Sequence, residues 1–165
     1  MTTTREKGFT LVEVIVVLVL LGIVSAIAGM GLVVLAHGYL FSNQNATMVE
    51  KGQTAITRIV KELGDCTVTA GTATSVTVRR QSDGTSHTFS WAGTPGNPLL
   101  LTDPGPDIAV LTDNVASFIL AYYDNGGSIV AATAASLSQV QSTLQLIAAD
   151  NSVHTFTNRV YIKTQ

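Results

Sequence analysis

The sequence contains very little cysteine. Cys66 is the only one among 165 residues, and this excludes an internal disulfide, a CxxC redox pair and a zinc site built from cysteines. The compartment stays open, because an oxidising space permits disulfides without requiring them. No activating partner is evident for Cys66, so we interpret it as a buried structural thiol.

Charged residues are also scarce. Asp, Glu, Lys and Arg make up 12% of the chain, about half the usual share in soluble domains. The net charge is −2 and the basic residues are scattered, so no basic stripe indicates a nucleic-acid partner. Mean hydropathy is +0.36, so the chain has an excess of apolar residues.

The apolar excess is concentrated near the N-terminus. Between Val14 and Ala36 there is no charged residue and no proline. At about 1.5 Å per residue in a helix, this stretch covers the roughly 30 Å hydrocarbon core of a bilayer. Arg5 and Lys7 precede it and the next charge after it is Glu50, so we expect the N-terminus to stay cytoplasmic.

The carboxylate of Glu13 directly precedes this apolar run. At mid-bilayer such a charge costs roughly 2.5–3.5 kcal/mol on insertion scales, and less near the interface. A removable signal peptide would have a shorter run followed by an A-x-A-like exit, whereas here the run is longer and no such triplet follows it directly. An ordinary single-pass anchor fits the length but does not explain Glu13.

The stretch KGFTLVEVIVVLVLLG, residues 7–22, resembles the processing signature of type IV prepilins and pseudopilins. It combines a basic leader, Gly-Phe, Thr-Leu-Val-Glu and an apolar run. The resemblance implies that a prepilin peptidase cuts after Gly8 and methylates the new amino terminus at Phe9. It also implies that Glu13 serves subunit assembly. An ordinary membrane anchor is the alternative.

The implied cut gives Glu13 a physical role. It releases an α-amino group with a pKa near 7.7–8.0, which is largely cationic at neutral pH. In a bundle of parallel stems, this amine on one subunit can meet Glu13 of a neighbour. Two charges that are costly alone in lipid become tolerable as a pair, and the pair sets the axial register.

The chain divides into four segments: a leader (1–8), a transmembrane stem (9–36), an amphipathic helical continuation (37–64) and a β-rich head (65–165). Gly64-Asp65 is a plausible helix stop. The continuation rests on apolar residues spaced three and four apart, namely Met48, Ala55, Ile56, Ile59, Val60 and Leu63.

Alternating apolar residues predict strands in the head. About five antiparallel strands packed on the long helix give an α+β, pilin-like fold. The stretch Thr94–Pro106 holds all four prolines and is expected to be a loop, and 131–135 a loop or short helix. The expected strands contain Val76 and Val78; His87, Phe89 and Trp91; Phe118, Leu120 and Tyr122; Leu144 and Leu146; and Phe156, Val160 and Ile162.

Catalysis finds little support. His37, His87 and His154 are far apart in the sequence, and no G-x-S-x-G elbow frames a nucleophile. A surface or packing role for His87 is the simpler interpretation. We therefore expect that the protein is not an enzyme.

In Tyr122-Tyr123, strand alternation places one ring inward in the core and leaves the other available to a partner.

One loop contains a weak metal candidate. Asp103 and Asp107 flank Pro-Gly-Pro, and calcium prefers carboxylate and carbonyl oxygens. Two acids are too few for a calcium motif, and an acidic surface turn explains them as well. No other cofactor is expected.

The stem has glycines but no proline, although major pilins of this family often carry a proline there. Gly22, Gly29 and Gly31 each cost about 1 kcal/mol of helix propensity against alanine. They could soften the stem or let neighbouring helices approach closely. Small residues that are simply tolerated in a lipid-facing helix are an equal explanation.

Two C-terminal stretches carry a further resemblance. VLTDNVASFILAYYDNGG (110–127) and FTNRVYIKT (156–164) resemble minor pseudopilins of the J type in type II secretion and minor pilins of PilW type. This implies an inner-membrane subunit with a periplasmic head that joins a tip complex. Its partners would be other pseudopilins, the prepilin peptidase, the inner-membrane assembly platform and membrane lipid.

Other members of the family fit the same leader. A minor subunit of a type IV or competence pilus is the nearest alternative, and a major subunit is a further one. The single cysteine departs from major pilins that close a C-terminal disulfide loop. A tethered enzyme or binding module that borrows the pilin leader belongs to a different class of protein.

Overall fold

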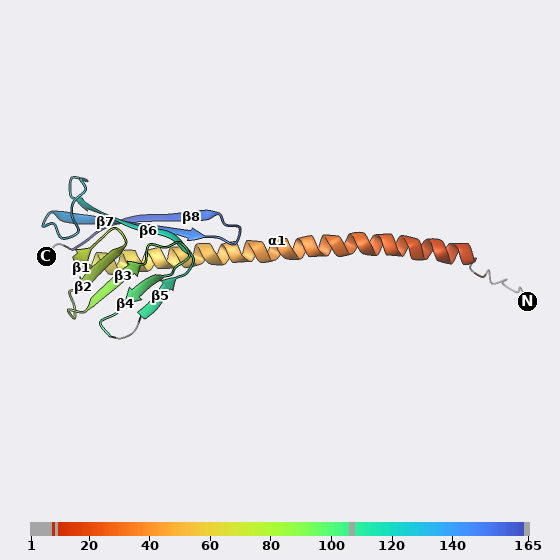
Figure 1. Ribbon diagram of the computed structural model, residues 1–165, viewed down its shortest axis with the longest axis horizontal. Helices are drawn as coiled ribbons and strands as arrows, with labels where there is room; N and C mark the ends of the chain where they lie inside the picture. Colours follow the sequence, from red (N-terminus) through yellow and green to blue (C-terminus); the bar gives the residue numbers. More distant parts are fainter. Residues whose placement is uncertain (1–7, 9, 106–107, 164–165) are drawn as a thin grey trace, which may run out of the picture. The chain divides into compact units, whose positions relative to one another are not determined.

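The computed structural model describes residues 8, 10–105 and 108–163. The chain forms two compact units, which we call the N-terminal unit (Met1–Asn43) and the C-terminal unit (Gln44–Gln165). Helix α1 (Leu11–Asp65) contributes residues to both, and eight strands follow it in the part of the chain described (Figure 1).

Helix α1 begins after an N-cap threonine and ends at the predicted Gly64-Asp65 stop. The Thr10 hydroxyl oxygen accepts a hydrogen bond from the Glu13 backbone N–H at 3.3 Å, as expected of an N-cap threonine. The helix runs for 55 residues through Gly64 to Asp65, and β1 begins at the next residue. The predicted long helix and its predicted stop are confirmed.

The strands form two antiparallel sheets. The first has the order β1-β2-β3-β4-β5, with β1 (Cys66–Gly71), β2 (Ser75–Arg80), β3 (Ser86–Trp91), β4 (Leu99–Thr102) and β5 (Ile108–Thr112). The second has the order β6-β7-β8, with β6 (Val115–Asp124), β7 (Leu137–Ile147) and β8 (Val153–Tyr161). The antiparallel α+β, pilin-like fold expected from the sequence is confirmed.

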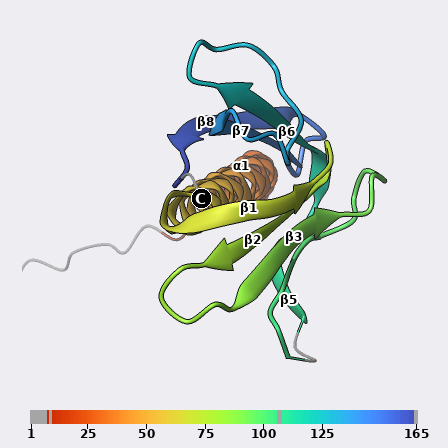
Figure 2. The ribbon, with the colours of Figure 1, turned by 90° about the vertical axis from the view of Figure 1, so that its left-hand side faces the viewer.

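The C-terminal part of α1 lies between the two sheets, with β1–β3 on one side and β6–β8 on the other (Figure 2). A β-carbon at Gly52 would come within 2.5 Å of the Phe156 ring, so glycine allows β8 to close onto the helix. The predicted Val60 is only half-buried. The residues of α1 that are buried here are Met48, Gly52, Ala55, Ile56, Ile59 and Leu63.

The prediction of a loop over Thr94–Pro106 was wrong for β4. Prolines disrupt a strand ladder because they cannot donate a backbone hydrogen bond, but Pro98 and Pro104 lie on either side of the strand. Leu99 and Leu101 alternate into the core and pair with β3.

The expectation of about five strands was also too low, since β1, β4 and β5 were not predicted. The chain reverses between β5 and β6 through Asn114, which has a left-handed φ of 52°. From there β6 enters a second sheet on the other side of α1. Residues 131–135 form turns, which agrees with the expected loop and not with a short helix.

Candidate functional site

The first turn of α1 holds a single carboxylate, that of Glu13. Its side chain is exposed, and the Thr10 cap starts the helix so that Glu13 lies at the third helical position. A negative charge is favourable there because the helix dipole is positive at this end. Gly8 is exposed and precedes the helix. Arg5, Lys7 and Phe9 lie outside the described residues.

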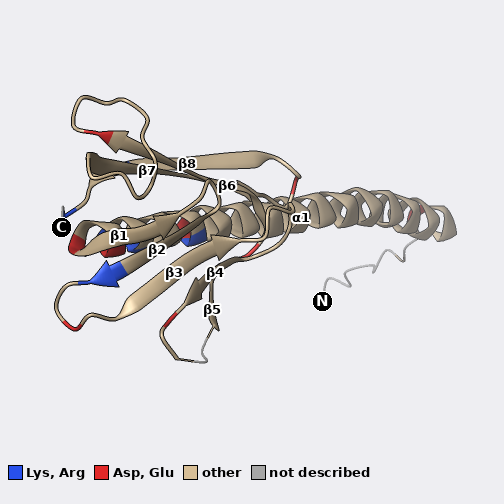
Figure 3. Ribbon diagram, turned by 60° about the vertical axis from the view of Figure 1, so that its left-hand side comes forward, with Lys and Arg blue, Asp and Glu red and all other residues tan. Residues whose placement is uncertain are grey.

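The N-terminal unit exposes a long apolar surface on every side of α1. Its large apolar side chains are exposed from Leu11 to Phe41, and a continuous exposed apolar surface usually marks a membrane or protein interaction site. The helix is long and apolar enough to cross a membrane, with a mean hydropathy of 2.9 in its most apolar window. The sequence has no Asp, Glu, Lys or Arg between Glu13 and Glu50, and the corresponding long stretch of α1 is tan in Figure 3.

The stem glycines have open surroundings. A β-carbon added to Gly22, Gly29 or Gly31 would meet no atom of the described residues within 4 Å. No described residue therefore requires glycine at these positions, and a neighbouring helix is one partner that could.

A chain of polar contacts in the head resembles the nucleophile–histidine–aspartate arrangement of hydrolases. His87 Nδ1 lies 2.6 Å from Asp103 Oδ1, and His87 Nε2 lies 3.2 Å from the Thr85 hydroxyl oxygen. However, Thr85 donates its hydroxyl proton to Asp83 Oδ1 at 2.7 Å. The hydrogen bonds from Thr85 lower the pKa of Asp83, which keeps that acceptor ionised.

The direction of that hydrogen bond shows whether His87 accepts a hydrogen bond from the Thr85 hydroxyl. A hydroxyl has one proton to donate, and here the proton is directed to Asp83 and not to His87. In this arrangement His87 does not accept the Thr85 hydroxyl hydrogen bond. The arrangement ties the β2–β3 turn to Asp103.

The same pattern occurs at the start of β8. Ser152 donates its hydroxyl proton to Asp150 Oδ1 at 2.5 Å and lies 3.4 Å from His154 Nε2. Asp-x-Ser/Thr-x-His thus appears twice, at 83–87 and 150–154, each time where a turn leads into a strand. The sequence analysis did not identify this pattern, although the spacing was visible. Its repetition indicates turn chemistry.

The metal candidate is reduced to one described carboxylate. Asp103 is in contact with His87, and Asp107 lies outside the described residues. Within the described ranges, no group of three His, Cys, Asp or Glu side chains is placed to hold a metal ion.

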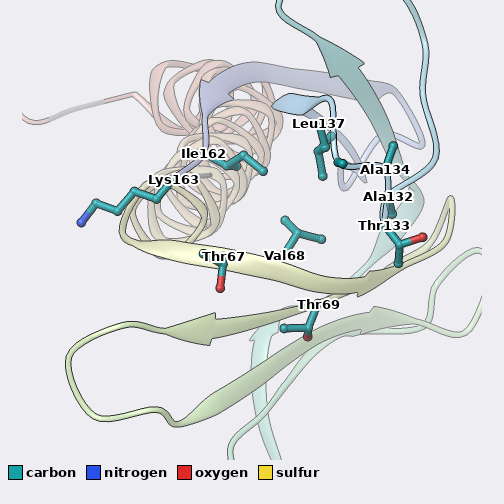
Figure 4. Close-up of a pocket in the computed structure, with 10 residues that line it drawn as sticks. Thr67, Val68, Thr69, Ala132, Thr133, Ala134, Leu137, Ile162 and Lys163 are labelled. Carbon is teal, nitrogen blue, oxygen red and sulfur yellow. The ribbon is translucent and has the colours of Figure 1, made fainter. Parts of the chain in front are cut away.

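A cavity of about 300 Å³ lies between β1 and the loop that precedes β7. Figure 4 shows Val68, Leu137 and Ile162 pointing toward one another across it, while Thr67 and Thr69 point to the other side of β1. Lys163 is the only charged residue in its lining. The cavity has a mixed lining of aliphatic and threonine side chains, and the described residues that line it include no acid–base pair.

Two groups that could have been reactive are buried. Burial raises the pKa of the Cys66 thiol, and the Glu62 carboxylate adds to the shift, which agrees with the interpretation of an inert thiol. Burial also raises the pKa of Tyr122 to about 12, and its hydroxyl donates to the Thr72 carbonyl oxygen at 2.9 Å. Tyr123 faces the other way, with the Arg159 guanidinium 4.0 Å from its ring centroid.

The fold is α+β and pilin-like, with one long N-terminal helix that is apolar enough to cross a membrane, followed by antiparallel sheets. Residues 3–29 match the family model described as the prokaryotic N-terminal methylation motif, which indicates the type IV pilin and pseudopilin family. The motif points to a structural subunit that interacts with other pilins and a prepilin peptidase. Comparisons with curated proteins and with solved structures each found no significant match.

Proposed function

We propose that the protein is a J-type minor pseudopilin that assembles through α1 into the pilus-like structure of a type II secretion system, within its tip complex. The observation that carries this proposal is an exposed carboxylate, Glu13, in the first turn of a helix whose large apolar side chains from Leu11 to Phe41 are exposed. The methylation motif surrounds that carboxylate. The likeness of 110–127 and 156–164 to minor pseudopilins supports the subtype.

Cleavage after Gly8 would act as the chemical switch for assembly. Before the cut, the nitrogen of Phe9 is a neutral amide and cannot compensate a buried carboxylate. The cut produces an amine that is largely cationic at neutral pH, and methylation leaves it able to carry a proton. Only a processed subunit can therefore offer a positive charge at the Phe9 nitrogen, at the start of the stem, to Glu13 of its neighbour.

The pair would also fix how far neighbouring stems slide along one another. A slip by one helical turn moves each charge by about 5.4 Å and leaves both uncompensated in an apolar medium, which is strongly unfavourable. An apolar helix surface by itself has no such preference, because its side chains are nearly equivalent along its length. In this proposal the charges determine register and the apolar surface determines association.

The central test replaces Glu13. We expect Glu13→Ala to insert into the membrane normally, because it removes a charge, and to be absent from sheared filaments. Membrane fractionation and filament immunoblots measure the two outcomes. Glu50→Ala is the matched control, because Glu50 is an exposed glutamate of the same helix in the C-terminal unit, and it should be incorporated. Normal incorporation of Glu13→Ala would refute the proposed role.

Processing has its own test. Mass spectrometry of the N-terminal peptide should show loss of residues 1–8 and a methyl group on Phe9. Gly8→Val should remain full-length, because a branched side chain replaces the glycine at the cut. An unmethylated chain that retains residues 1–8 in the presence of active prepilin peptidase would contradict the proposal.

The nearest alternative, a minor subunit of a type IV or competence pilus, differs in its neighbours. Because Cys66 is buried, a cysteine introduced at the exposed Gln53 would be the reactive thiol of the head. Crosslinking from Gln53→Cys to sibling pseudopilins supports secretion, whereas crosslinking to pilus subunits supports the alternative. A tethered enzyme would show activity in a fragment beginning near Asn43.

A further inference from the structure

Helix α1 carries two aromatic residues, and both lie at the far end of its apolar stretch. Tyr39 is 73% exposed and Phe41 is 42% exposed. The polar residues Ser42 and Asn43 follow directly, and the N-terminal unit ends there. The residues therefore change from apolar to aromatic to polar within a few positions.

The position of these rings matches the thickness of a bilayer. At about 1.5 Å per residue, the axial distance from Glu13 to Tyr39 is about 39 Å. A bilayer with its headgroup regions measures roughly 40–45 Å. A helix that keeps Glu13 in the inner headgroup region thus brings Tyr39 to the outer one.

The directions of the side chains favour lipid as the partner. Successive residues of a helix point about 100° apart, so Tyr39, Leu40 and Phe41 point in three different directions, and all three are exposed. A partner helix would contact a stripe of residues three and four apart. A lipid interface surrounds the helix and can contact all three.

The charge pattern leaves these rings as the anchors at this end. Arg5 and Lys7 precede the stem only in the precursor, because the proposed cut after Gly8 removes them, and after Glu13 the next Asp, Glu, Lys or Arg is Glu50. Aromatic residues concentrate at membrane interfaces because their rings are apolar and tyrosine also carries a polar hydroxyl.

We propose that Tyr39 and Phe41 anchor α1 in the outer headgroup layer, with phospholipid as the partner, and so fix the depth at which the subunit rests before assembly. This inference rests on the membrane insertion in the proposed function. Moving the subunit outward into a filament would withdraw these rings from the headgroup layer, so the anchor opposes premature extraction.

Tryptophan fluorescence can measure this depth. Trp91 is the only tryptophan, so full-length Trp91→Phe provides a background for single reporters at Tyr39→Trp, Ile27→Trp and Gln53→Trp. The protein would be placed in phosphatidylethanolamine–phosphatidylglycerol vesicles that contain lipids brominated either near the headgroup or near the acyl-chain end.

We expect the Tyr39→Trp reporter to lose more fluorescence with the shallow bromine, and the Ile27→Trp reporter with the deep one. Gln53→Trp, in the C-terminal unit, should lose little with either. A Tyr39→Trp reporter that is unquenched, or quenched most by the deep bromine, would overturn the anchor while Ile27→Trp still reports insertion. Loss of quenching at Ile27→Trp would instead refute membrane insertion.

A second measurement compares the protein with and without the side chains of Tyr39 and Phe41. With Ile27→Trp as reporter, Tyr39→Ser/Phe41→Ser should change the ratio of shallow to deep quenching, because the helix loses its outer anchor. Leu32→Ser/Val34→Ser removes two exposed apolar residues with the same spacing and serves as the matched control. An unchanged ratio in the aromatic double variant would show that the rings do not set the depth.

Discussion

Two isoleucines of the same helix have opposite surroundings. Ile27 in the N-terminal unit is 67% exposed, whereas Ile59 in the C-terminal unit is completely buried. Their chemistry is identical, so apolarity alone does not identify a core. The pattern around them does: charged residues separate the apolar positions near Ile59, while the helix around Ile27 is apolar on every side.

The two patterns require different partners. A helix that is apolar all round needs apolar surroundings on all sides, such as lipid or neighbouring stems. An amphipathic helix needs one or two covering surfaces, and here the two sheets supply them (Figure 2). One continuous helix therefore has two parts that are stabilised in different ways, and matched substitutions can separate them.

The largest expected difference comes from truncating the two isoleucines. Ile59→Ala should lower the free energy of unfolding of the head by about 2–5 kcal/mol, because it removes a buried side chain and leaves a cavity. Ile27→Ala should change it by less than about 0.5 kcal/mol, as an exposed substitution does. Chemical denaturation in detergent, followed by Trp91 fluorescence, measures both. Equal losses would contradict the division into two parts.

A charge introduced into the stem should weaken membrane insertion and leave the stability of the head unchanged. Ile27→Asp should weaken membrane insertion by roughly 2.5–3.5 kcal/mol, the cost of a charge at mid-bilayer, without changing the unfolding of the head. Gln53→Asp, at an exposed site in the head, should leave insertion unchanged. Carbonate extraction of membranes quantifies the inserted fraction. Full insertion of Ile27→Asp would show that this part of α1 does not lie in lipid.

Two glycines of α1 offer a smaller, matched comparison. Gly52→Ala should destabilise the head by about 1–3 kcal/mol, the usual cost of overpacking, because the new methyl group meets Phe156. Gly31→Ala meets no described atom within 4 Å and should not destabilise the subunit. Thermal unfolding compares them, and adding Phe156→Leu to Gly52→Ala should recover part of the loss. An unchanged midpoint for Gly52→Ala would argue against the close contact.

The smallest expected effect is a pH dependence confined to the head. Hydrogen bonds from Thr85 and Ser152 lower the pKa values of Asp83 and Asp150. Their stabilising contribution is therefore complete above the ordinary aspartate pKa of about 3.9 and is lost as pH falls through the lowered folded values. Denaturation midpoints measured across this range should decline less in Asp83→Asn/Asp150→Asn. An equal decline in both proteins would assign the acid sensitivity to other groups.

Much of the molecule could be predicted from local patterns. The length of α1, its stop at Gly64-Asp65 and the alternation in β2, β3, β6, β7 and β8 all depend on residues close together in the sequence. The missed β4 shows the limit, because prolines on either side suggested a loop and only pairing with β3 shows that Leu99 and Leu101 form a strand.

Some features of the candidate site could likewise be predicted from the sequence, and others could not. The methylation motif and the apolar run are continuous segments, so the sequence suggested the family directly. The contact of His87 with Asp103 joins β3 to the residue that follows β4, whereas the hydrogen bond that the Thr85 hydroxyl donates to Asp83 is local to the turn before β3. Sequence spacing could place Asp83, Thr85 and His87 near one another but could not show to which of the other two the Thr85 hydroxyl donates its hydrogen bond.

The sequence by itself determined the helix, its apolar stretch and the carboxylate at its start, because helix periodicity, capping and hydropathy are properties of neighbouring residues. Only the tertiary structure decided that the head has two sheets and that α1 passes between them. It also decided that Gly52 receives the ring of Phe156. These features arise from contacts between residues distant in the sequence, whose free energy depends on surfaces that exist only after the chain has folded.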